Sequence, residues 1–144
     1  MPDPISAKEV ADMFVKATER IDFYWNFGLV FLTALIGWLI SLKKPLTGLM
    51  KVLVSIVYII AALMNILGLY ESYTFAEALR VDLLRVASDY PQFLPNTRAA
   101  LDARSFLPQR AIAIAIHVVV GAGVLVVVWF ARFGESVAAR SNGD

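Results

Sequence analysis

The sequence predicts an all-α integral membrane protein with three transmembrane helices, and three observations lead to this class. Three apolar stretches occur, at residues 23–42, 52–70 and 111–130, and each has about the length that a helix needs to cross a bilayer. None of the three contains Asp, Glu, Lys or Arg. The whole chain is 59% hydrophobic and only 17% charged, which is unusual for a water-soluble domain. Segments of this length satisfy their backbone groups in lipid as helices.

Composition also limits the classes of function. A formal net charge of +1 argues against nucleic acid as a partner. The absence of cysteine excludes disulfides, thiolate metal sites and iron–sulfur clusters, and we expect no cofactor. The three spans leave no room for a separate soluble domain, so residues 1–144 are interpreted as one membrane domain.

The chain before the first span is expected to form an amphipathic helix over residues 5–22. Ser6 and Glu9 have the spacing of a capping box, and apolar residues recur at helical intervals behind them. Neither proline nor glycine interrupts the sequence before Gly28, so this helix is expected to continue into the first span. Pro45 then ends it, within a short basic hairpin at residues 43–51.

After the second span, residues 71–110 are interpreted as a loop that carries amphipathic helices. Thr74 and Glu77 suggest a second capping box, although the second span could instead run on into this helix. The apolar stripe of this helix consists of Phe75, Leu79, Leu83 and Val86. The carboxylates of the loop are expected to form a solvated face with local ion pairs: Glu71, Glu77, Asp82, Asp89 and Asp102. A short helix is predicted over 97–104. Pro108 fits the first turn of the helix that forms the third span. Residues 131–144 are expected to form a tail.

With three spans, the N-terminal segment and the long loop lie on the same side of the membrane. We expect their amphipathic helices to pack on each other as a small cap; the alternative is that they lie flat on the lipid surface. Lys43, Lys44 and Lys51 in the hairpin favour a cytoplasmic hairpin, because short loops carry the strongest positive-inside signal. A count of all basic residues favours the opposite orientation.

Each span carries one stripe of polar or small residues at helical spacing. These stripes contain the candidate site residues, namely Asn26, Thr33 and Gly37 in the first span, Ser55, Tyr58 and Asn65 in the second, and Ala113, His117 and Gly121 in the third. Small residues let helices approach closely, and polar side chains can hydrogen-bond between helices. The stripes are therefore interpreted as helix contacts within a bundle or an oligomer. Alternatively, an oligomer could use them to line a hydrophilic path.

His117 is the ionisable side chain that lies deep within a span. An intramembrane ionisable residue is a candidate functional group, so three interpretations remain open. A neutral imidazole can form a packing contact, it can belong to a proton or ion path, or two copies can share a haem across a dimer. The packing interpretation predicts that His117→Phe is tolerated, whereas leucine at Gly37 or Gly121 disrupts assembly.

No span contains a carboxylate relay, a broken helix or a nucleotide-binding loop. We therefore expect a non-enzymatic accessory or scaffolding subunit of a membrane complex. The alternative is a homo-oligomeric pore or small transporter. The expected partners are the lipid bilayer and either further copies of the chain or other membrane subunits. An Ala-, Val- and Arg-rich composition suggests a bacterial inner membrane.

Overall fold

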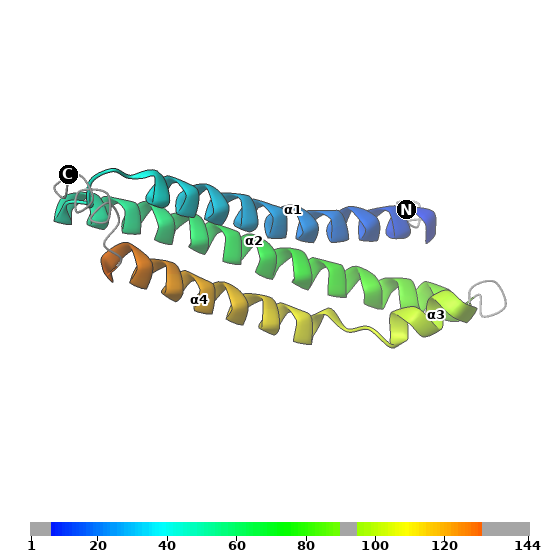
Figure 1. The fold of residues 1–144 in the computed structure, drawn as a ribbon. Helices are drawn as coiled ribbons and strands as arrows, with labels where there is room; N and C mark the ends of the chain where they lie inside the picture. The colour runs from blue at the N-terminus through cyan, green and yellow to red at the C-terminus, as the bar shows by residue number, and fades with distance from the viewer. Residues whose placement is uncertain (1–6, 90–94, 131–144) are drawn as a thin grey trace, which may run out of the picture. The chain divides into compact units, whose positions relative to one another are not determined.

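A computed structural model describes residues 7–89 and 95–130 of the chain. In these ranges the chain forms α1 (Ala7–Ser41), α2 (Gly48–Asp89), α3 (Pro95–Asp102) and α4 (Phe106–Phe130), and no strand (Figure 1). Helices α1, α2 and α4 are long and apolar enough to cross a membrane. The predicted all-α fold with three transmembrane helices is therefore confirmed.

The apolar residues of these helices face mostly outward. In the most apolar part of α1, α2 and α4, only 6%, 28% and 17% of the residues are buried within the protein. Large side chains such as Val30, Ile40 and Val119 are exposed. Water-soluble proteins rarely expose apolar surface on this scale, whereas lipid tails solvate it well. The three helices therefore have the surface of an integral membrane protein.

Helix α1 runs without a break from Ala7 to Ser41, so the prediction that the N-terminal segment continues into the first span is confirmed. Ser6, the first residue of the predicted capping box, lies outside the described residues. Helix α2 begins at Gly48, four residues before the predicted span, and Thr47 caps it. The Thr47 hydroxyl accepts a hydrogen bond from the N–H of Met50 at 3.3 Å, which satisfies one free donor of the first turn.

Helix α2 continues through Gly68 to Asp89, so the capping box predicted at Thr74 and Glu77 is wrong and the run-on alternative is confirmed. The Thr74 hydroxyl instead donates to the carbonyl of Tyr70 at 2.7 Å within the helix. A residue in the middle of a helix has no free N–H group ahead of it to cap. Within the predicted apolar stripe, Phe75 is 46% exposed, whereas Leu79 is buried.

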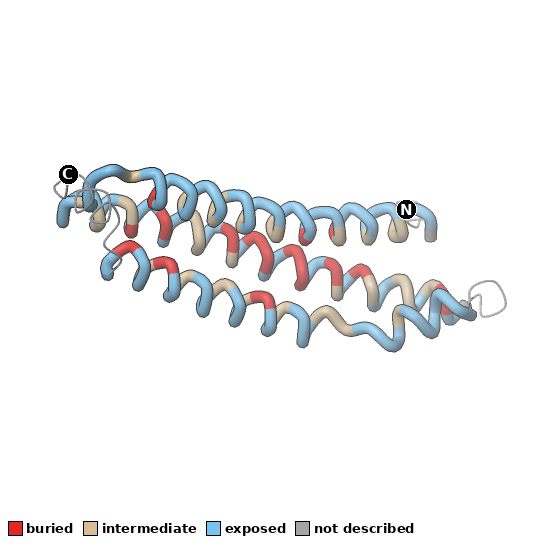
Figure 2. Tube along the Cα trace, viewed as in Figure 1, coloured by how far each residue is buried: buried red, intermediate tan, exposed pale blue. Residues whose placement is uncertain are grey.

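The described residues form two compact units, which share the three long helices. Unit 1 contains α1 up to Trp25 and the chain from Leu67 to Ile114; unit 2 contains Asn26–Ile66 and α4 from Ala115 onward. In each unit, buried residues follow the α2 segment more continuously than the other helices (Figure 2). The reason is that α2 has contacts with both α1 and α4 within each unit.

Unit 1 has a core in which the N-terminal segment packs on the residues that follow the second apolar stretch. Ala17 and Ile21 of α1 lie against Tyr73, Ala76 and Leu79 of α2. This is the packing that the sequence predicts for its helical cap. Unit 2 has a separate core, formed by Leu39, Tyr58, Val124 and Val128.

Helices α3 and α4 begin with residues that suit a helix start. Pro95 opens α3, where its missing N–H costs nothing. Before α4, the Ser105 hydroxyl accepts a hydrogen bond from the N–H of Leu107 at 3.3 Å. Pro108 lies in the first turn of α4, as predicted. The helix therefore starts at Phe106, five residues before the apolar stretch at 111–130.

Candidate functional site

A polar contact between three helix segments lies within unit 2. Asn65 of α2 is 4% exposed, and its Nδ2 atom lies 3.0 Å from Nε2 of His117 on α4. Gly28 of α1 covers this pair, because a Cβ atom at position 28 would be 2.9 Å from Asn65 Nδ2 and 3.4 Å from His117 Nε2. A larger residue at position 28 would require the side chain of Asn65, or α1 itself, to shift.

The chemistry of the Asn65–His117 pair follows from its atoms. The side-chain amide of Asn65 can donate or accept, and so can the imidazole of His117, so the direction of this hydrogen bond depends on the imidazole tautomer. The Oδ1 atom of Asn65 is buried without a hydrogen-bond partner in the described residues. Those residues also contain no group of three potential metal ligands. The pair is suited to fixing the register of α2 against α4.

His117→Phe is expected to lower the free energy of unfolding by about 1–2 kcal/mol, because it leaves the buried amide of Asn65 without this hydrogen-bond partner. The double variant Asn65→Leu, His117→Phe should recover part of this loss, since it removes both polar partners. Unfolding by titration with a denaturing detergent measures both values. An unchanged unfolding curve for His117→Phe would show that the contact does not stabilise the fold.

The other inward residues of the stripes also have neighbours within their own unit. Tyr58 is buried, and its ring stacks on Phe31 with 6.2 Å between centroids. A Cβ atom at Gly121 would lie 3.6 Å from the Tyr58 hydroxyl, so Tyr58 occupies the space beside this glycine. Ala113 is buried in the core of unit 1.

Ser55 of α2 hydrogen-bonds to a residue at the C-terminal end of α4. Its hydroxyl accepts a hydrogen bond from the indole N–H of Trp129 at 3.1 Å. The ammonium group of Lys51 donates to the main-chain carbonyl of Trp129 at 2.8 Å. A cation at the last carbonyls of a helix is favourable, because these groups have no partner within the helix. Lys51 therefore caps the C-terminal end of α4. From the sequence, its position at the edge of the second span indicates only that its charge points toward solvent.

The stripe of the first span faces outward. Asn26, Thr33 and Gly37 are all exposed. The Thr33 hydroxyl donates to the carbonyl of Leu29 at 2.8 Å, within its own helix. No atom lies within 4 Å of a Cβ built at Gly37. The fold thus separates the nine candidates into an inward group on α2 and α4 and an outward group on α1.

An ion pair between Glu77 and Arg80 in unit 1 joins three helices, and the sequence patterns did not predict this pair. The guanidinium of Arg80 donates to both carboxylate oxygens of Glu77, at 2.8 and 3.0 Å. The same carboxylate accepts the N–H of Phe106 at 2.9 Å, at the start of α4. Arg80 also donates to the carbonyl of Leu101 at 2.7 Å, near the end of α3. Each charge therefore meets the helix end of opposite partial charge.

The electrostatics of Glu77 differ from those of a solvated carboxylate. The side chains of Arg80 and Glu77 are only 12% and 15% exposed. Hydrogen bonding from Arg80 lowers the pKa of Glu77, against the opposing effect of its burial, and the N–H of Phe106 lowers it further. Glu77 is therefore ionised at neutral pH. It forms a local ion pair, as expected for the carboxylates of this loop, but its side chain is largely shielded from solvent, so the expectation of a solvated position is wrong for Glu77. The Glu–Arg spacing of three residues is the signal in the sequence that could have identified the pair.

The polar stripe residues of the three spans thus form two groups. Those on α2 and α4 join helix segments within a unit, and those on the middle of α1 are left on the surface. Comparison with known protein families, with curated proteins and with solved structures finds no match for this chain.

Proposed function

We propose that this chain is a non-enzymatic accessory or scaffolding subunit of a membrane complex. The supporting observation is the outward stripe of Asn26, Thr33 and Gly37 on α1. An asparagine amide that faces lipid loses the hydrogen bonds it would have in water, so a polar group on a neighbouring helix stabilises it. Gly37, with open space beside it, allows such a helix to approach closely. The partner we propose is a transmembrane helix of another subunit.

The proposed location is a bacterial inner membrane, with the hairpin at residues 43–51 in the cytoplasm. The hairpin has three lysines and no acidic residue in nine positions. Short loops of this charge stay on the cytoplasmic side of bacterial membranes. The Ala-, Val- and Arg-rich composition supports a bacterial source.

A second candidate uses the same stripe differently. If several copies of the chain assemble through α1, Asn26 and Thr33 could line a narrow hydrophilic path between them. Ser55, Tyr58 and Asn65 are buried within unit 2, so they are poorly placed for such a lining. The two candidates differ in composition, since a pore contains only copies of this chain and a scaffold contains other subunits.

Gly37→Leu is expected to reduce the amount of complex at least tenfold while the chain still folds, because a Cβ atom at this position has open space around it within the protein. Gly123→Leu is the matched control, since Gly123 on α4 also has open space around it and lies outside the stripe. Gly121→Leu is unsuitable, because it would press on Tyr58. Native mass spectrometry of each variant, extracted from its own membrane, measures the assembly.

Three results are distinguishable in that experiment. Loss of larger subunits with Gly37→Leu, but not with Gly123→Leu, supports the scaffold. A complex that contains this chain alone supports the pore, and ion flux into liposomes then tests it. If the Gly37→Leu protein keeps every complex intact, the stripe is not the contact surface.

A further inference from the structure

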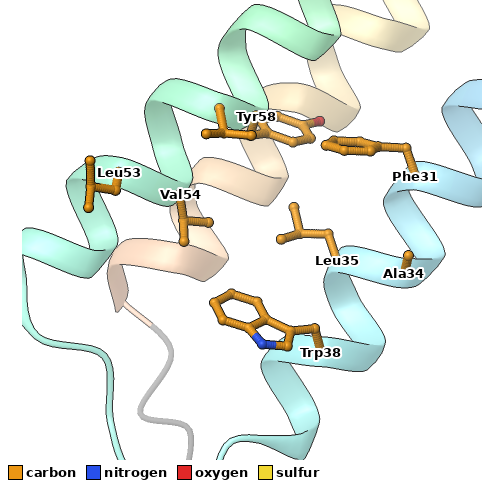
Figure 3. A pocket seen from close by; sticks show the side chains of 8 residues that line it. Phe31, Ala34, Leu35, Trp38, Leu53, Val54 and Tyr58 are labelled. Atoms are coloured by element: carbon orange, nitrogen blue, oxygen red, sulfur yellow. The ribbon is translucent and has the colours of Figure 1, made fainter.

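We propose that a groove between α1 and α2 in unit 2 binds one anionic phospholipid, with an acyl chain in the groove and the phosphate near Lys43 and Lys44. The groove has a volume of about 350 Å³. Figure 3 shows its lining, with side chains from both helices that point toward one space. The residues that define it are Phe31, Ala34, Leu35 and Trp38 of α1, with Leu53 and Tyr58 of α2.

The shape of the groove suits an acyl chain. The stacked rings of Phe31 and Tyr58 close one end, and Trp38 lies toward the end where α1 leads into the connection to α2 (Figure 3). Phe31 and Trp38 are seven residues apart, about 10 Å along the helix axis. Ala34 leaves room between them, because its side chain is a single methyl group. A groove with an apolar lining, open to the bilayer, is filled most simply by a lipid tail.

The lysines that follow α1 select the headgroup. Lys43 and Lys44 are exposed in the connection between α1 and α2, which begins after Ser41. No acidic residue occurs between Asp22 and Glu71, so the sequence offers these lysines no local carboxylate. Lysines at the membrane surface attract anionic lipids, each by about 1 kcal/mol. An apolar groove whose α1 side is followed, five residues after Trp38, by two lysines thus complements the tail and the phosphate of one molecule.

The groove is separate from the stripe of the proposed subunit contact. At about 100° per residue, Thr33 lies about 160° around α1 from Phe31 and Leu35. Gly37 lies about 100° or more from Phe31, Leu35 and Trp38, and among the α1 residues of the groove only Ala34 is nearer to it, at about 60°. A lipid in the groove therefore leaves the stripe open to another helix. The lipid site does not depend on the proposed function, and each can fail without the other.

The test compares two lipids that have the same acyl chains. The full-length protein in a neutral detergent is titrated with palmitoyl-oleoyl phosphatidylglycerol or phosphatidylcholine, and native mass spectrometry measures the lipid that is retained. We expect the protein to retain phosphatidylglycerol at least tenfold more strongly, since each lysine contributes about fivefold. The double variant Lys43→Gln, Lys44→Gln should reduce this preference to near one. Its control is Arg98→Gln, Arg104→Gln, which removes two exposed charges elsewhere and should leave the preference unchanged.

A second variant tests the groove itself. Ala34→Phe fills the groove and should lower the retention of both lipids, whereas Leu63→Phe, at an exposed position outside the groove, should not. Equal retention of the two lipids by the unmodified protein would overturn the proposal. A preference for phosphatidylglycerol that persists in the lysine variant would also overturn it. If Ala34→Phe abolished a dimer of the chain and left lipid retention unchanged, the groove would be occupied by a second copy and the proposal would be wrong. The lysines lie outside the helices, so their variant remains informative if Ala34→Phe does not fold.

Discussion

Replacing Gly68 with alanine is expected to destabilise unit 1 by about 1–3 kcal/mol. The physical reason is that a Cβ atom at position 68 of α2 would overlap with the ring of Tyr24 on α1. Tyr24 packs on the core of unit 1, so its ring cannot move aside without disturbing that core. Titration with a denaturing detergent measures the loss of stability.

Gly37→Ala is the matched control for this prediction. Both glycines lie inside long helices, but a Cβ atom at Gly37 meets nothing within 4 Å. Alanine favours a helix by about 0.5–1 kcal/mol over glycine, so Gly37→Ala should be neutral or stabilising. Gly68→Ala should cost less stability in a Tyr24→Ala background than in the unmodified protein, because the overlap is then absent. If the two single variants unfold alike, close packing at Gly68 does not contribute to stability.

Glu77→Ala is expected to lower the free energy of unfolding by about 2–4 kcal/mol. The substitution leaves the largely buried Arg80 without its carboxylate partner, and it removes the acceptor for the N–H of Phe106 at the start of α4. Glu71→Ala is the control, because Glu71 is an exposed carboxylate on the same helix. It should change stability by less than about 0.5 kcal/mol. Equal effects of the two variants would contradict the role given to Glu77.

The contribution of Glu77 is also expected to depend on pH. The pKa of Glu77 in the folded protein lies below its ordinary value of 4.5, chiefly because Arg80 donates hydrogen bonds to it. The unfolded chain therefore binds a proton more readily, so this stabilisation is present above about pH 4.5 and is lost as the pH falls through the lowered pKa. The stability difference between the unmodified protein and Glu77→Gln should shrink in acid. A difference that is constant from neutral pH to pH 3 would contradict this mechanism.

The local patterns of the sequence predict the helices well but not every helix boundary. Apolar length and the absence of charge predict the three spans, and the uninterrupted residues before Gly28 predict that α1 is continuous. Thr74 and Glu77 have the same spacing as a true capping box. That spacing does not reveal whether a helix has already begun upstream, and α2 began at Gly48. The local pattern therefore predicted a helix start where the chain was already helical.

The candidate site shows a similar division. Helical spacing places Ser55, Tyr58 and Asn65 on one face, and they are all buried. The same rule places Asn26, Thr33 and Gly37 on one face, which is exposed. Spacing along one helix defines a face but does not specify what covers it. Gly28 and Gly68 illustrate the limit, because their close neighbours come from other helices.

The sequence by itself determined that this protein is helical and crosses a membrane, because these properties depend on local apolar length and on the cost of unpaired backbone groups in lipid. Only the tertiary structure decided which polar residues meet. The pairing of Asn65 with His117, and the position of Glu77 between Arg80 and the start of α4, join residues that lie up to 52 positions apart. Such contacts depend on the rotation and register of whole helices, which no short stretch of sequence specifies.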